Sequence, residues 1–170
     1  MIAQRQGGPF FIDFEAFQHG DEQFVIKEMC IIDYNLPLTP LYFIFKNKVR
    51  WSSLKRDRQK TYSYQTRNIH GLQWEEGQSR YCQKCIFYWI KEMFPHCEES
   101  LFYVLGDQKQ RFLENEFPKL TFLNYDNVTL NTLPHIPSNI SCLYRNHDAN
   151  HCACLKCFRM YHHFVYMKNL

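Results

Sequence analysis

The chain has 170 residues and a mass of 20.7 kDa, enough for one well-packed domain with little left for a second. Hydrophobic residues make up 45% and charged residues 22% of it, ordinary values that argue against disorder. No stretch approaches the roughly 18 consecutive apolar residues that a membrane-spanning helix needs, so we expect no membrane partner. The net charge is +3, and eight cysteines accompany eight histidines.

The first residues give no sign of a secretion signal. Met1–Pro9 contains one arginine and no apolar core, so we expect a protein that is not secreted. Its expected location is the cytoplasm or the nucleus, perinuclear granules included. In such a reducing compartment cysteines are more often thiols or metal ligands than disulfides. The cysteine and histidine content therefore predicts a bound metal.

Apolar runs and chain breakers predict an α/β order. Three strands with short connections come first and are typical of an antiparallel meander. A helix, a strand, a helix, a strand and a closing helix follow. We therefore predict one domain over residues 1–170, with a mixed sheet of about five strands flanked by helices. The predicted strands are Pro9–Phe17, Phe24–Ile32, Leu41–Phe45, Ser100–Leu105 and Leu120–Asn124. The predicted helices are Ser79–Met93, Asp107–Phe117 and one from His147 or Asp148 to Met167.

Basic charge is concentrated after the third strand. Lys46–Arg67 carries eight basic residues and one acid, so it has a charge of +7 and the rest of the chain −4. Trp51, Tyr62 and Tyr64 lie in the same window, where aromatic rings could stack on unpaired bases while basic side chains hold phosphates. No amphipathic helical period accompanies the charge, which favours nucleic acid over a membrane surface. The alternative is a solvated loop without a partner.

Trp74 lies in an unusual local pattern, His70-Gly71-Leu72-x-Trp74-x-x-Gly77. Its indole could be a stacking platform beside the basic segment, or a buried anchor between two bends that glycine permits. The sequence leaves both interpretations open. The candidate nucleic-acid residues are Lys48, Arg50, Lys55, Arg56, Arg58, Lys60, Arg67 and Trp74.

The element order and an acidic pair on the first strand resemble the ribonuclease H-like fold of the DEDD exonucleases. In that family, carboxylates from separate elements hold two Mg²⁺ ions about 4 Å apart. Asp13-Phe14-Glu15 is similar to the first motif of the family, and residues two apart on a strand project to the same face. Lys109 stands where the second motif has an aspartate, and Cys152, five residues after His147, stands where the third has one. A lysine at that position would repel the metal ions.

These replacements make the chain similar to the Maelstrom domain, a ribonuclease H-like relative from the germline piRNA pathway. That domain has a Glu-Cys-His-Cys zinc site, with the glutamate in the second strand and the other ligands at and within the last helix. The resemblance implies that Glu28, Cys142, His147 and Cys152 bind a structural zinc ion, which would tie the last helix to the sheet. The alternative is that Glu28 is a solvated or paired strand residue and that both cysteines are small core residues.

Two other groups of cysteines and histidines are weaker metal candidates. The first flanks one predicted helix of about 14 residues, which is about 21 Å long, so ligands at its two ends cannot meet around one ion. The second lies within the closing helix, where Cys154 and Cys157 share a face and need outside partners. Thiols are the expected state of both groups. The members of the first are Cys82, Cys85, His96 and Cys97.

The resemblance and the basic segment together predict a zinc-stabilised, catalytically degenerate exonuclease-like domain that binds single-stranded RNA. The resemblance implies a role in small-RNA silencing of the piRNA type, with silencing-complex proteins as partners. One alternative is an active single-strand ribonuclease, in which Asp13 and Glu15 are catalytic and Asp107 or Asp148 supplies a third carboxylate for Mg²⁺ or Mn²⁺. The other is a protein-interaction scaffold without nucleic acid, because aromatic side chains are enriched at interfaces.

Overall fold

The structure is a computed structural model that describes residues 7–20, 23–125, 142 and 151–170. Its longer helices and strands follow the predicted order, with a helix added over Arg56–Gln65 and a short strand at Ser79–Arg80, where the first predicted helix was expected to begin. The strands are β1 (Phe10–Gln18), β2 (Phe24–Asp33), β3 (Leu36–Lys46), β4 (Ser79–Arg80), β5 (Leu101–Val104) and β6 (Thr121–Asn124). The α-helices are α1 (Arg56–Gln65), α2 (Gln83–Met93), α3 (Asp107–Glu116) and α4 (Ala153–Lys168). Shorter helical turns lie at Trp51–Ser53, Thr66–His70 and Cys97–Glu99.

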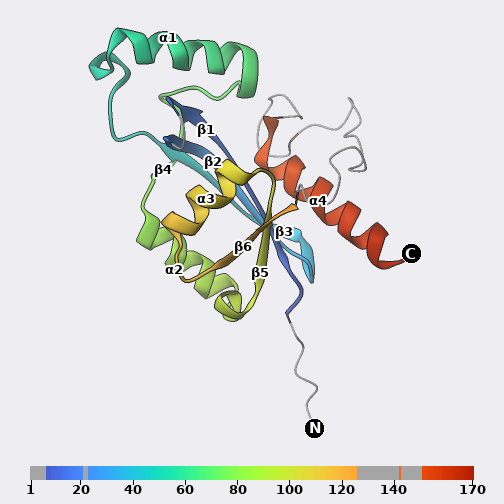
Figure 1. Cartoon of the computed structure of the whole chain (residues 1–170). Helices are drawn as coiled ribbons and strands as arrows, with labels where there is room; N and C mark the ends of the chain where they lie inside the picture. The colour runs from blue at the N-terminus through green and yellow to red at the C-terminus, as the bar shows by residue number, and fades with distance from the viewer. Residues whose placement is uncertain (1–6, 21–22, 126–141, 143–150) are drawn as a thin grey trace.

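The six strands form one mixed sheet in the order β4-β3-β2-β1-β5-β6. Strands β1, β2 and β3 are antiparallel, and the pairs β1–β5, β5–β6 and β3–β4 are parallel. This arrangement confirms the predicted α/β class and the antiparallel first three strands. Helices α2 and α3 lie on one face of the sheet and α4 on the other (Figure 1). In the part of the chain that the structure describes, no helix has the length and apolarity needed to cross a bilayer.

Strand β4 is a correction to the predicted helix over Ser79–Met93. Residues 79 and 80 pair with the end of β3, and the helix begins only at Gln83. Gly77 permits the approach because it has a φ of +136°, and a Cβ atom there would lie 2.4 Å from the backbone nitrogen of Lys46. No other residue type fits such a close backbone contact. Local apolar periodicity could not reveal this, since the constraint comes from β3.

Strand β1 lies at the centre of the sheet and is buried on both faces. Phe10, Ile12 and Phe14 belong to the core beneath α2 and α3, whereas Phe11 belongs to the core beneath α4. The alternation of a strand places residues 11, 13 and 15 on one face. Asp13 and Glu15 therefore continue the face that α4 covers, and both are buried, at 0% and 6% exposure.

The second half of the basic segment folds into helix α1, and the residues from 47 to 55 that precede it contain one short helical turn. Helix α1 lies at one end of the sheet, apart from the helices on its two faces (Figure 1). Tyr62 is its buried residue and stacks on Trp74, with ring centroids 5.0 Å apart and planes 13° apart. Phe17 at the end of β1 contacts both rings. The Gln65 side chain bonds both the N–H and the C=O of Gln18, which fixes α1 to β1. Tertiary contacts thus stabilise a helix that has almost no apolar face.

A fully buried lysine holds the segment that carries Trp74. Lys27 has 0% exposure, and its Nζ donates to the carbonyl oxygens of Phe45 at 2.6 Å, Trp74 at 3.1 Å and Glu76. Three carbonyl acceptors satisfy the three donors of an ammonium group. Lys27 therefore joins strands β2 and β3 to the turn that supports α1.

Candidate functional site

Asp13 and Glu15 meet two lysines beneath α4. The Nζ of Lys109, from α3, donates to Asp13 Oδ1 at 2.7 Å, and the Nζ of Lys156, from α4, donates to Glu15 Oε1 at 2.6 Å. Each lysine also lies 3.9 Å from the other carboxylate. The four side chains thus form one cluster of two buried carboxylates and two partly buried lysines, in which positive and negative charges alternate.

The charges in this cluster depend on one another. Burial raises the pKa of Asp13, and the positive charges of Lys109 and Lys156 oppose that rise. Burial alone would lower the pKa of Lys156, but the carboxylates of Asp13 and Glu15 outweigh it and raise the pKa above the ordinary 10.5. Lys109 donates in addition to the carbonyl oxygen of Phe14. Two ammonium groups therefore contact the carboxylates that would face Mg²⁺ in a two-metal centre.

The sequence anticipated only part of this arrangement. Lys109, which the exonuclease resemblance assigns to the position of the second motif, lies against the acidic pair. Lys156 was missed, although it follows Cys152 by one helical turn, which is the signal that could have identified it. Asp107, one of two candidates for a third carboxylate, accepts a hydrogen bond from Asn124 at 2.6 Å and so joins α3 to β6. Asp148 lies outside the described residues.

Glu28 links strand β2 to the start of α4. Its side chain is fully buried, and Oε1 accepts the backbone N–H of Ala153 at 2.6 Å. Its Oε2 accepts the hydroxyl of Tyr42 at 2.7 Å. A carboxylate at a helix N-terminus is favourable because the first N–H groups of the helix lack partners within it. Cys152 is the N-cap residue of α4, so Glu28 and Cys152 meet at the same helix end.

Five buried cysteines surround this helix end. Cys142 contacts both Cys152 and Cys154, Cys154 contacts Cys30, and Cys157 donates to the carbonyl oxygen of Cys30 at 3.3 Å. A hydrogen bond with Cys142 raises the pKa of the Cys152 thiol, and burial and nearby Glu28 raise it further. The raised pKa favours the protonated form of the Cys152 thiol. Sequence reasoning missed Cys30, whose cross-strand pairing with Asp13 could be found only from the strand register.

Three of the four predicted zinc ligands lie in this neighbourhood. Cys152 interacts with both Cys142 and Glu28, all three lie close to the Tyr42 hydroxyl, and His147 lies outside the described residues. A carboxylate and two thiols match the chemistry that zinc prefers. Among the described residues, however, no group of three or more histidine, cysteine or acidic side chains is arranged so that it could hold a metal ion. The donor set fits zinc in chemistry and burial, without surrounding a common centre.

The group of metal candidates that flanks α2, namely Cys82, Cys85, His96 and Cys97, does not form one metal site. A disulfide joins Cys82 to Cys85, so the expectation of thiols or metal ligands is wrong for this pair. Helix α2 continues unbroken to Met93 and separates the pair from Cys97, which is buried with 0% exposure. The length of the helix therefore excludes a single site at its two ends.

The basic side chains form an exposed surface around α1. Three of them, Arg56, Lys60 and Arg67, line an open hollow of about 500 Å³ together with Trp51 and Tyr64. In the described part of the chain none of the basic residues named as RNA candidates takes part in an ion pair. All of these basic candidates are exposed, namely Lys48, Arg50, Lys55, Arg56, Arg58, Lys60 and Arg67.

Two aromatic residues of this region are not available for stacking on a base. Trp74 is 7% exposed, and its Nε1 donates to the carbonyl oxygen of Val49 at 2.9 Å. Tyr62 is 2% exposed and lies against Trp74. The interpretation of Trp74 as a stacking platform is therefore wrong, and the buried-anchor alternative describes it. Tyr64, at 62% exposure, and half-buried Trp51 are the aromatic side chains that line the hollow.

Comparison with known protein families and with curated proteins finds no match for this chain. The resemblance to the Maelstrom domain thus remains a prediction from the residues quoted for it. The mixed sheet, with its antiparallel first three strands and helices on both faces, is consistent with the ribonuclease H-like layout.

Proposed function

We propose that this protein is a catalytically degenerate, ribonuclease H-like domain that binds single-stranded RNA on the surface of α1. The observation that carries the proposal is the open hollow in which Arg56, Lys60 and Arg67 lie beside Trp51 and Tyr64. Unpaired basic side chains attract phosphates, and exposed aromatic rings stack on unpaired bases. A volume of about 500 Å³ is within the range of ligand-binding pockets.

The spacing of residues along α1 sets the order in which their side chains would contact the RNA. Arg56, Lys60 and Tyr64 are four residues apart from one another, so they follow one side of α1 with a rise of about 6 Å between neighbours. Two positive charges are followed by an aromatic ring along this stripe. We infer that consecutive phosphates lie against the charges and that an unpaired base stacks on Tyr64. A duplex could not present its bases in this way, which favours a single strand.

The lysine–carboxylate cluster favours binding without two-metal cleavage. Lys109 and Lys156 hold Asp13 and Glu15 at hydrogen-bond distance, and their positive charges oppose divalent cations at the same carboxylates. The role in small-RNA silencing, with silencing-complex proteins as partners, is proposed on the Maelstrom resemblance.

Zinc is proposed as a structural ion at the start of α4. Glu28, Cys142 and Cys152, with His147, would hold it, and the ion would crosslink β2 to the closing helix. Coordination would need deprotonated thiols, so binding would release the protons that the buried cysteines hold without metal. The neighbourhood of Glu28 and two thiols around the first turn of α4 supports this proposal.

Arg56→Glu is expected to weaken binding of a single-stranded oligoribonucleotide about tenfold and to reduce its salt dependence. The logarithm of affinity falls with the logarithm of salt by about 0.7 for each phosphate contact to a single strand, and the variant removes about one contact. Fluorescence anisotropy across a salt series measures both quantities. Lys168→Glu makes an equal charge change at the far end of α4 and should leave the salt dependence of the affinity unchanged. A flat salt response, with equal affinity in Arg56→Glu, would contradict the proposal.

The full chain is expected to contain about one zinc ion, and Cys152→Ser is expected to lose it. Elemental analysis of the purified proteins measures the metal. Chelation should unfold the domain, since binding free energy at a structural zinc site is folding free energy. Cys85→Ser, which changes an exposed cysteine away from α4, should keep the zinc. Wild-type protein without zinc, or zinc that is lost with Cys85 instead, would contradict the site.

A further inference from the structure

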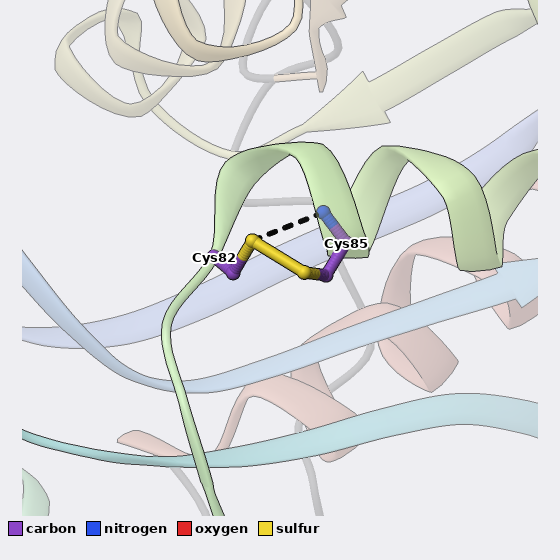
Figure 2. Close-up of a disulfide and its surroundings, with 2 residues drawn as sticks. All are labelled: Cys82 and Cys85. Atoms are coloured by element: carbon purple, nitrogen blue, oxygen red, sulfur yellow. Dashed lines mark hydrogen bonds between the residues drawn. A yellow bond between two sulfur atoms is a disulfide. The ribbon is translucent and has the colours of Figure 1, made fainter.

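The two cysteines at the start of α2, Cys82 and Cys85, are accessible to solvent. A disulfide joins Cys82 to Cys85, with Cα atoms 5.2 Å apart (Figure 2). Cys85 is exposed and Cys82 is half-buried, whereas the other six cysteines of the chain are buried. We propose that Cys82 and Cys85 form a reversible dithiol–disulfide site that exchanges with glutathione. This site is independent of the RNA surface and of the proposed zinc ion.

The position of the pair on the helix favours the thiolate that exchange requires. Cys82 is the N-cap residue of α2, and its Sγ accepts the backbone N–H of Cys85 at 3.3 Å (Figure 2). Unpaired N–H groups and the positive end of the helix dipole stabilise a thiolate at this place. The first turn of α2 contains no acidic residue, and Lys84 adds a positive charge between the cysteines. Cys82 is therefore the nucleophile of the pair.

A groove beside the pair has the chemistry to receive glutathione. It has a volume of about 380 Å³, and the residues between the two cysteines, Gln83 and Lys84, form part of its lining. Glutathione carries two carboxylates, which Lys84 and Lys119 in the groove can pair with. The acid of the groove, Glu116, accepts a hydrogen bond from the Tyr81 hydroxyl. The remaining lining residues are Phe87, Phe117 and Pro118.

The exchange proceeds in two steps that balance. In the reduced protein the Cys82 thiolate attacks one sulfur of glutathione disulfide, forms a mixed disulfide and releases one glutathione thiolate. The Cys85 thiolate then attacks the Cys82 sulfur, closes the protein disulfide and releases the second glutathione thiolate. The two protons lost by the cysteines convert these thiolates to two molecules of glutathione. The protein pair is oxidised by two electrons, and glutathione disulfide is reduced by two.

The test equilibrates the full chain in buffers of graded ratios of reduced glutathione to glutathione disulfide. Acid quenching, alkylation of free thiols and intact-mass analysis then count the thiols. We expect two thiols to titrate reversibly. Cys85→Ser should accumulate one glutathione on Cys82, whereas Cys82→Ser should react at least tenfold more slowly because Cys85 lacks the capped position. Serine is a good N-cap residue, so Cys82→Ser keeps the start of α2 intact.

The groove is tested with the double variant Lys84→Glu and Lys119→Glu in the Cys85→Ser background. Glutathionylation of Cys82 should slow about tenfold, the loss expected for a hydrogen bond to a charged group. Reaction with 2-hydroxyethyl disulfide, which has no carboxylate, should change less than twofold. A pair that stays oxidised in a large excess of reduced glutathione, or stays reduced in glutathione disulfide, overturns the proposal. Equal rates for Cys82 and Cys85, or equal slowing with both disulfides, also overturn it.

Discussion

Lys156→Met is expected to lower the free energy of unfolding by about 3 to 5 kcal/mol, the usual result of removing one partner from a buried ion pair. The Lys156 ammonium group lies 2.6 Å from Glu15 and 3.9 Å from Asp13, and both carboxylates are buried. Without Lys156, Lys109 alone would face two negative charges. Urea denaturation followed by circular dichroism measures the loss. A loss below about 1 kcal/mol, as for an exposed pair, would mean that water already compensates the carboxylates.

Two further variants separate the loss of the ion pairs of Lys156 from the general effect of replacing a lysine by methionine. Lys91→Met removes the pair with Glu98, whose side chains are 45% and 40% exposed, and should cost no more than about 1 kcal/mol. In Lys156→Met with Glu15→Gln, one charge of each sign is absent. This double variant should recover much of the lost stability, because one carboxylate then remains for Lys109.

The pH dependence of Lys156→Met follows from the raised pKa of Lys156. Its folded-state pKa lies above the ordinary 10.5, because Asp13 and Glu15 outweigh the effect of burial. The folded protein therefore holds this proton more tightly than the unfolded chain, and the stabilisation is complete below pH 10.5. It is lost as the pH rises through the folded-state pKa. The stability difference between wild type and variant should be constant from neutral pH to 10.5 and shrink above it.

Trp74→Ala is expected to destabilise the protein by about 3 to 5 kcal/mol, the usual cost of truncating a buried aromatic residue. The indole is 7% exposed, stacks on Tyr62 at 5.0 Å and contacts Phe17 at 5.1 Å between ring centroids. These contacts hold α1 against the end of the sheet. Chemical denaturation measures the loss, and hydrogen exchange should show that protection falls first in α1.

Trp74→Phe is the matched control for this variant. It keeps an aromatic ring and removes the hydrogen bond from Nε1 to the Val49 carbonyl oxygen, which should cost about 1 kcal/mol. RNA affinity should be unchanged in Trp74→Phe, because a buried ring does not touch the ligand. An affinity loss with full stability in Trp74→Ala would instead show that the indole stacks on a base.

Local patterns in the sequence were sufficient for much of the fold. The alternation of apolar residues and the turn residues identified the five longer strands, and the pattern from Phe10 to Phe17 placed Asp13 and Glu15 on one face. The exposed charge of the 46–67 segment was also visible, because it depends on composition alone. Its helix was not visible, since α1 buries only Tyr62 and offers no apolar period to detect.

The tertiary structure decided which side chains meet. The sequence by itself determined an α/β order, an acidic pair on the first strand, a basic segment and a cysteine surplus. Only the fold placed Lys156 against Glu15, Cys30 among the thiols at α4, and Trp74 beneath α1. These contacts join residues far apart in the chain, and their formation depends on strand register and helix docking. Local propensity predicts neither the strand register nor the helix docking, because both are set by the packing of the whole sheet.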